Sequence, residues 1–255
     1  MNQFIAFTKK ELYESHATYR LYILLAVFFI LGVMGPLLAM LTPTIMEALM
    51  AGELGIEITM PEPTAMDSWV QFFGGISEMG IPVLVIIFCG IMSNEFSKGT
   101  LINLLTKGLK RHTVIFSKFL TAAMLWLVAY VIAVAVAYAY TAFYWEMDAI
   151  NYVGIVFGAL WLYGLMFLSA LIFGGTIFGN FYGALFSAVG LFVVMLIWSF
   201  IPGISRFTPQ RLTDAVSLMN GTANASDFWP VIGIALGFTV LFIAGAVVIF
   251  NRKKV

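Results

Sequence analysis

Long runs of apolar residues dominate the chain. Six runs are long enough to cross a bilayer, whose hydrocarbon core of about 30 Å takes roughly 20 mostly apolar residues in a helix. They cover residues 20–42, 72–93, 117–144, 152–176, 183–201 and 229–250. The break between the fourth and fifth runs rests on the Gly- and Asn-rich segment GGTIFGNFYG. The pattern predicts an all-α polytopic membrane protein, with six transmembrane helices in a single domain over residues 1–255.

Composition excludes a soluble globular protein. Of the 255 residues, 62% are hydrophobic and 10% are charged, whereas soluble domains average about 25% charged residues. The 13 Lys and Arg balance the 13 Asp and Glu, so no net basic field favours nucleic acid as a partner. A single cysteine, Cys89, lies in an apolar run and provides neither an intrachain disulfide nor a thiolate metal site.

The few charges are distributed unevenly, and the positive-inside rule turns this asymmetry into an orientation. If both termini lie inside, only Arg206 and Arg211 among the basic residues lie outside, and most carboxylates lie outside with them. We therefore expect a protein of the cytoplasmic membrane with both termini in the cytoplasm. That orientation puts 11 of the 13 basic residues inside: Lys9, Lys10, Arg20, Lys98, Lys107, Lys110, Arg111, Lys118, Arg252, Lys253 and Lys254.

Two segments outside the runs carry their own patterns. Residues 1–19 mix apolar and charged side chains, which predicts a helix lying in the cytoplasmic interface, with a frayed tail as the alternative. Residues 202–228 begin with Pro-Gly and contain isolated apolar anchors, which predicts short re-entrant helices dipping into the outer leaflet.

The loop of residues 94–116 is amphipathic. Leucines recur at helical spacing at positions 101, 104, 105 and 109, while Lys98, Lys107, Lys110 and Arg111 line the remaining surface. An apolar helix face needs a partner, so the pattern favours a docking helix for a soluble cytoplasmic protein. The alternative is a helix that lies on the inner leaflet with its basic residues on lipid phosphates.

Motifs for catalysis and for nucleotide binding are missing. The sequence contains no G-x-x-x-x-G-K-[ST], no H-E-x-x-H and no G-x-S-x-G, so we expect no catalytic residue, no metal and no cofactor in this chain. Glu78 is the one candidate ionisable residue within a span, near its outer end. Glu78 supports an alternative hypothesis, a carrier or channel that works without an ATPase and uses a membrane gradient.

Three stretches resemble the permease subunit of type-2 ATP-binding-cassette (ABC) exporters, the half-size six-span kind of bacteria and archaea. FTKKELYESHATYRLYILLAVFFILGV resembles the family's opening helix and first span. NEFSKGTLINLLTKGLKRHTVIFSKFL resembles its most recognisable segment. ISRFTPQRLTDAV resembles its outer re-entrant hairpin, at Phe207 and Pro209. Gly108 stands where relatives often have proline, which leaves the turn before the basic residue in place but removes the rigidity that a proline ring would give it.

The resemblance implies that residues 94–105 form a coupling helix that docks on a separate ATPase subunit. Two permease chains, as a homodimer or a heterodimer, would work with two ATPases, which bind the ATP and magnesium. Acidic and basic residues would orient the docking and leucines would supply buried contact; the implied docking residues are Glu95, Lys98, Gly99, Thr100, Leu101, Leu104, Leu105, Lys107, Arg111 and Lys118. Besides the gradient-driven carrier or channel, a structural or sensory membrane subunit is a third hypothesis, and the sequence leaves the substrate open.

Overall fold

The fold is helical throughout the part of the chain that the structure describes. The computed structural model describes residues 3–54, 61–97, 99–100, 105–106, 108–146 and 151–253, and every regular element in these ranges is a helix. This confirms the all-α prediction. The six predicted membrane-crossing helices are also confirmed, since helices of sufficient length and apolarity cover Arg20–Ala51, Ala65–Phe96, Arg111–Tyr144, Val153–Phe178, Phe181–Ser199 and Ala225–Arg252.

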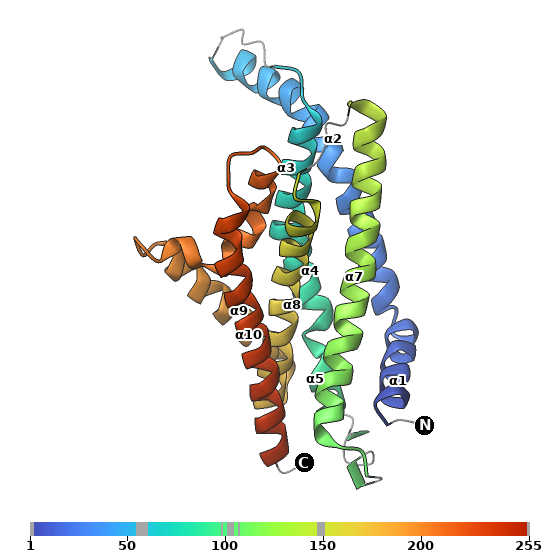
Figure 1. Cartoon of the computed structure of the whole chain (residues 1–255). Helices are drawn as coiled ribbons and strands as arrows, with labels where there is room; N and C mark the ends of the chain where they lie inside the picture. The colour runs from blue at the N-terminus through green and yellow to red at the C-terminus, as the bar shows by residue number, and fades with distance from the viewer. Residues whose placement is uncertain are drawn as a thin grey trace.

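The helices form an elongated bundle with α8 (Val153–Phe178) inside it (Figure 1). Of the apolar stretch of α8, 78% is buried by protein, against 28% for α9 (Phe181–Ser199) and 22% for α10 (Ala225–Arg252). α2 (Arg20–Leu54) and α7 (Arg111–Tyr144) run side by side along the bundle. The remaining apolar surface of the outer helices suits contact with lipid rather than water.

The second span is built from four consecutive helical segments: α3 (Ala65–Gly75), the π-helix η1 (Ile76–Gly80), α4 (Ile81–Phe88) and α5 (Gly90–Ser97). It begins at Ala65, ahead of the apolar run, because Thr64 and Asp67 form a capping box. The Thr64 amide donates to Asp67 Oδ2 at 2.8 Å, and Thr64 Oγ1 accepts from the Asp67 amide at 3.4 Å. These polar bonds extend the helix past the residues that hydropathy alone selects.

Backbone breaks separate two pairs of consecutive helices, α1 (Gln3–Ala17) from α2 and α8 from α9. α1 stops before Tyr19, whose φ of +57° ends the helix ahead of α2. α8 ends at Gly179, whose φ is +70°, and the Asn180 side chain caps α9 by accepting from the Gly183 amide at 2.7 Å. The Gly- and Asn-rich segment therefore makes the predicted break between the fourth and fifth helices.

Between α9 and α10 the chain turns back onto the bundle. The 3₁₀ helices η2 (Ser205–Phe207) and η3 (Pro209–Leu218) follow α9, and η3 contacts α3, α8 and α10. In Figure 1, α9 tilts away from the bundle and ends below the upper ends of α3 and α7. A re-entrant position of this segment in the outer leaflet stays a prediction, as does an interfacial position for α1.

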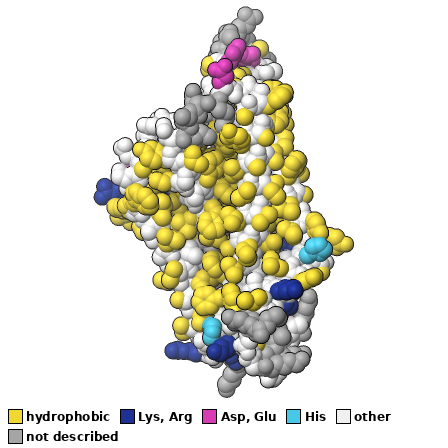
Figure 2. Space-filling view, turned by 45° about the vertical axis from the view of Figure 1, so that its right-hand side comes forward, with side chains coloured by type: hydrophobic (Ala, Val, Ile, Leu, Met, Phe, Trp, Pro, Cys, Tyr) yellow, Lys and Arg dark blue, Asp and Glu magenta, His cyan; other side chains and the backbone are white. Residues whose placement is uncertain are grey.

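Charge divides the bundle into two ends. Both termini lie at the same end (Figure 1), and the face shown in Figure 2 carries most of its Lys and Arg toward that end. Its Asp and Glu side chains gather at the opposite tip, and hydrophobic side chains cover the surface between them. The end that holds both termini is called the basic end below.

Candidate functional site

A buried cluster of charges joins three helices at the basic end. Lys118 of α7 lies 2.8 Å from Glu11 Oε2 of α1 and 3.3 Å from Glu95 Oε1 of α5, measured from its Nζ. The side chains of Lys118, Glu11 and Glu95 are only 2%, 5% and 3% exposed. Because isolated buried charges are costly, each of these groups depends on its partners.

The cluster continues toward the surface through a second lysine. Lys10 Nζ lies 3.0 Å from Glu11 and 2.7 Å from Glu14, and it also donates to Glu95. Burial alone would lower the pKa of Lys10, but hydrogen bonds to Glu14 and Glu95, together with the charge of Glu11, raise that pKa above its usual range. The ring of Phe7 lies 5.3 Å from the Lys10 ammonium and 5.8 Å from that of Lys118.

The geometry favours a structural role for these charges over a metal site. Carboxylate oxygens of Glu11, Glu14 and Glu95 lie within 4.8 Å of one another, a spacing that a metal ion tolerates. However, Lys10 and Lys118 already place two ammonium groups against these oxygens. We call the five residues Lys10, Glu11, Glu14, Glu95 and Lys118 the charge cluster, and it fastens α1 to α5 and α7.

The charge cluster reaches the segment that sequence patterns single out for docking. Thr100 Oγ1 donates to the Glu95 carboxylate. The preceding residue, Gly99, has a φ of +64°, and its amide donates to Phe96 O at 3.3 Å. Leu105 is half-buried against the core. Of the other predicted docking residues, Lys98, Leu101, Leu104 and Lys107 lie outside the described residues.

Gly108 stands where the family resemblance leads us to expect a proline. Its φ is +88°, a value that the proline ring forbids. Its carbonyl oxygen accepts a hydrogen bond of 3.2 Å from Gln3 Nε2. The turn before α7 is thus held through contact with α1 instead of through a rigid ring.

Two cations cap helix ends beside the charge cluster. Arg111 Nη1 donates to Phe250 O at 2.6 Å and also to Lys253 O, at the C-terminal end of α10. Lys253 Nζ donates to Thr176 O at 2.8 Å and to Ile177 O at 3.1 Å, at the end of α8. Positive charges near the last carbonyls of a helix counter its dipole. Arg111, a predicted docking residue, is therefore engaged within the chain.

The remaining predicted residues lie in the segment between α9 and α10, far from the charge cluster. Phe207 ends η2, where the Arg206 guanidinium lies 4.7 Å from its ring, and Pro209 begins η3 and is buried. The predicted docking residues that the structure brings together are thus Glu95, Thr100 and Lys118. Sequence patterns missed the α1 partners Lys10, Glu11 and Glu14, although all three lie in the stretch that resembles the family's opening helix.

A cavity of about 810 Å³ lies deeper in the bundle, between the second span, α8, α9 and η3. Its walls are largely apolar, from residues such as Phe73, Phe167 and Phe192. Its polar lining comes from Ser77, Glu78, Tyr163, Gln210, Thr213 and Asp214. Among the described residues, the side-chain oxygen of Gln210 is buried without a hydrogen-bond donor. The cavity has the mixed lining of a site that takes a mostly apolar ligand.

Asp214 gives this region a testable pH dependence. Burial raises its pKa above the usual value, against the opposing effects of the Arg211 charge and a hydrogen bond from Thr213. Because the folded protein then binds the proton more tightly than the unfolded chain, stability falls as pH rises from the unfolded pKa through the folded one. We expect Asp214→Asn to remove this decline. Melting temperatures of the wild type and of Asp214→Asn between pH 4 and pH 7 would check this prediction. If the two melting temperatures change with pH in the same way, the prediction is wrong.

A family model matches nearly the whole chain. The family described as ABC-2 family transporter protein matches residues 5–255, a range that includes the charge cluster, both 3₁₀ helices and the deep cavity. No curated protein matches the chain.

Proposed function

Because the chain belongs to the ABC-2 family of transporter proteins, we propose that it is the transmembrane permease subunit of an exporter driven by ATP hydrolysis on a separate subunit. The chain is a multi-pass membrane protein and a membrane component of an ABC transporter. In the proposed complex, two permease chains pair with two ATPase subunits at the cytoplasmic membrane. The basic end, with both termini, faces the cytoplasm.

The observation that carries the proposal is the buried charge cluster next to the predicted docking segment. Glu95 ends the second span, Lys118 lies near the start of the third, and Glu11 joins both to α1. A force applied to the segment between α5 and α7 would be passed to three helices at once. Buried ion pairs suit this task because moving one of the three helices away from the others would leave buried charges without their partners.

The predicted docking residues then divide into two roles. Glu95 and Lys118 are nearly fully buried, so they act as positioning residues that hold the segment rather than as contacts to the ATPase. Lys98, Leu101, Leu104 and Lys107 are proposed to meet the ATPase directly. Arg111 would link the same segment to the end of α10 through its hydrogen bond to Phe250 O.

Transport follows from this arrangement as a shift between two populations. ATP binding on the partner draws its two subunits together, and the docked segments follow. The charge cluster and Arg111 transmit the displacement to α1, α5, α7 and α10. The bundle then changes from inward-facing to outward-facing, with the deep cavity beside α8 and α9 as the substrate's proposed place of contact.

Gly99→Pro is expected to uncouple the ATPase without preventing membrane insertion. Proline cannot adopt the φ of +64° found at Gly99, and it removes the amide that donates to Phe96 O. Local strain of about 1–3 kcal/mol would lower the docked population by about 5- to 150-fold. The measurement is permease-stimulated ATPase activity, together with co-purification of the ATPase from the native membrane.

Gly221→Pro is the matched control for this test. Gly221 has a φ of +67° and its amide donates to Leu218 O, but it lies in the turn before α10, away from the charge cluster. The Gly221→Pro variant should insert into the membrane and leave stimulation of the ATPase unchanged. If no nucleotide-binding subunit accompanies the wild-type permease, or if Gly99→Pro behaves like its control, the coupling proposal is wrong.

Glu78 supports one alternative, a carrier driven by a proton gradient. It lies in the π-helix η1, lines the deep cavity and is exposed in the isolated chain. A carboxylate within a membrane span is costly unless it has a task. Transport by reconstituted vesicles separates the hypotheses. An exporter requires ATP and its partner and tolerates collapse of the proton gradient, whereas the carrier stops when the gradient is dissipated. A structural or sensory subunit would transport nothing under either condition.

A further inference from the structure

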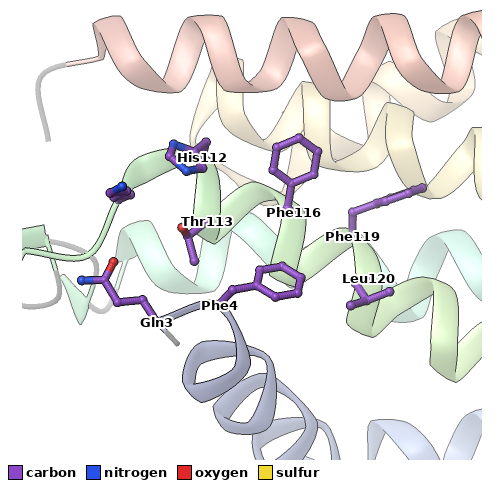
Figure 3. Close-up of a pocket in the computed structure, with 8 residues that line it drawn as sticks. Gln3, Phe4, His112, Thr113, Phe116, Phe119 and Leu120 are labelled. Atoms are coloured by element: carbon purple, nitrogen blue, oxygen red, sulfur yellow. The ribbon is translucent and has the colours of Figure 1, made fainter. Parts of the chain in front are cut away.

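A second cavity, of about 670 Å³, opens at the basic end between α1 and α7. Its lining follows one face of α7, since positions 112, 113, 116, 119 and 120 recur at helical spacing. Gln3 and Phe4 of α1 approach this face from the other side, and the Phe4 ring points toward Leu120 (Figure 3). We call this space the α1–α7 cavity.

Fixed contacts hold the two walls of the α1–α7 cavity in place. Gln3 Nε2 donates to Gly108 O at 3.2 Å, and Ser117 Oγ donates to Phe4 O at 3.5 Å. The charge cluster also fastens α1 to α7, through the ion pair between Glu11 and Lys118. The cavity is therefore part of the folded structure, because two hydrogen bonds and an ion pair hold its walls together.

The lining separates into a polar end and an apolar end. The polar end has Gln3, Lys110, His112 and Thr113, and the apolar end has Phe4, Phe116, Phe119 and Leu120. Phe116 is 47% exposed and Leu120 is 37% exposed, so a large apolar surface remains uncovered by protein. A ligand that covers both ends must itself be amphiphilic.

The polar end selects for negative charge. Lys110 and His112 are the titratable residues of the lining, and no carboxylate lines it. Within the described part of the chain, neither residue has an ion-pair partner, whereas the nearby carboxylates Glu11 and Glu95 are engaged by Lys118. Two cationic or polar nitrogen groups beside the Thr113 hydroxyl suit a phosphate group.

The depth of the cavity matches the boundary between lipid headgroups and acyl chains. The apolar membrane-crossing helix begins at Arg111, and a rise of about 1.5 Å per residue places Leu120 roughly 14 Å further along α7. The basic side chains thus lie at the level expected for headgroups, and the aromatic side chains lie beside the first part of the hydrocarbon core.

We propose that the α1–α7 cavity binds one acidic phospholipid. Its phosphate lies between Lys110 and His112, and the first methylenes of one acyl chain cover Phe116, Phe119 and Leu120. A soluble anion would use only the polar end, and a zwitterionic lipid would bring a cation against the two basic residues. The proposal rests on the cavity and its charges and does not depend on the proposed transport function.

Native mass spectrometry of the full chain, released from vesicles that contain equal amounts of phosphatidylglycerol and phosphatidylcholine, tests this site. The wild type should retain phosphatidylglycerol preferentially. Lys110→Glu should lower that retention by at least about fivefold, since loss of one basic residue near an acidic surface has about that effect and the new carboxylate adds repulsion. Lys9→Glu is the matched control, because Lys9 is an exposed lysine of α1 that does not line the cavity.

Two further measurements keep the outcome clear. Thermal melting shows whether Lys110→Glu is folded, and glycerol phosphate is added to the wild type as a soluble competitor that needs no variant. Equal retention of both lipids, or an equal loss in Lys9→Glu, would mean ordinary annular lipid contact and would overturn the site. Displacement of lipid by glycerol phosphate would identify a simple anion site and would likewise overturn the phospholipid assignment.

Discussion

Replacing Lys118 by methionine is expected to destabilise the folded protein by about 3–5 kcal/mol, because it removes one partner of a buried ion pair and leaves the other uncompensated. Its ammonium lies 2.8 Å from Glu11 and 3.3 Å from Glu95, and both carboxylates are at most 5% exposed. Lys10, at 39% exposure, can screen them only in part. The measurement is the unfolding midpoint of the purified permease in mild detergent.

A neutralised cluster separates the charge effect from simple loss of packing. Lys118→Met combined with Glu11→Gln and Glu95→Gln should recover most of the stability, since no uncompensated charge then stays buried. Lys9→Met, on an exposed residue of α1, is the surface control and should change the midpoint little. A triple variant as unstable as Lys118→Met would show that the ion pairs are not the source of the loss.

Gly174→Ala is expected to cost about 1–3 kcal/mol, the usual penalty for overfilling a packed interior. A Cβ at this position would lie 2.3 Å from the Ser187 Cβ and 2.7 Å from the Gly183 carbonyl oxygen. The second contact is with backbone, so α8 and α9 must move apart to relieve it. The change should appear as a lower melting temperature.

Gly158→Ala provides the comparison on the same helix. No atom lies within 4 Å of a Cβ built at Gly158, so alanine there meets open space and should be neutral or stabilising by up to about 1 kcal/mol through helix propensity. Equal effects of the two substitutions would show that close approach of α8 and α9 does not depend on glycine at position 174.

Hydropathy predicts the six long helices because twenty apolar residues have few alternatives to a helix in a bilayer. It does not predict where each helix ends, since polar contacts decide that. Thr64 and Asp67 start α3 ahead of its apolar run, and α7 starts at Arg111, within the predicted loop of residues 94–116. Hydropathy also does not predict the π-helix that contains Glu78, because a single five-residue turn is too short to set a period of its own.

The candidate site could be predicted only in part. The family resemblance directs attention to Glu95, Thr100 and Lys118, which the structure brings together. The partners from α1 are not readable from spacing, because Glu11 meets Lys118 across 107 positions of the chain. A lone sequence shows which residues are charged but not which of them are buried against each other, so it places Lys118 among the docking residues without showing that its side chain is buried.

That long separation has a consequence for synthesis of the protein. At about 5–20 residues per second, roughly 5–20 s pass between translation of Glu11 and translation of Lys118, which are 107 positions apart. During this interval the first span can insert, but Glu11 of α1 lacks its buried partner Lys118. A translational pause before residue 118 should therefore leave α1 accessible to protease, and release of the pause should protect it.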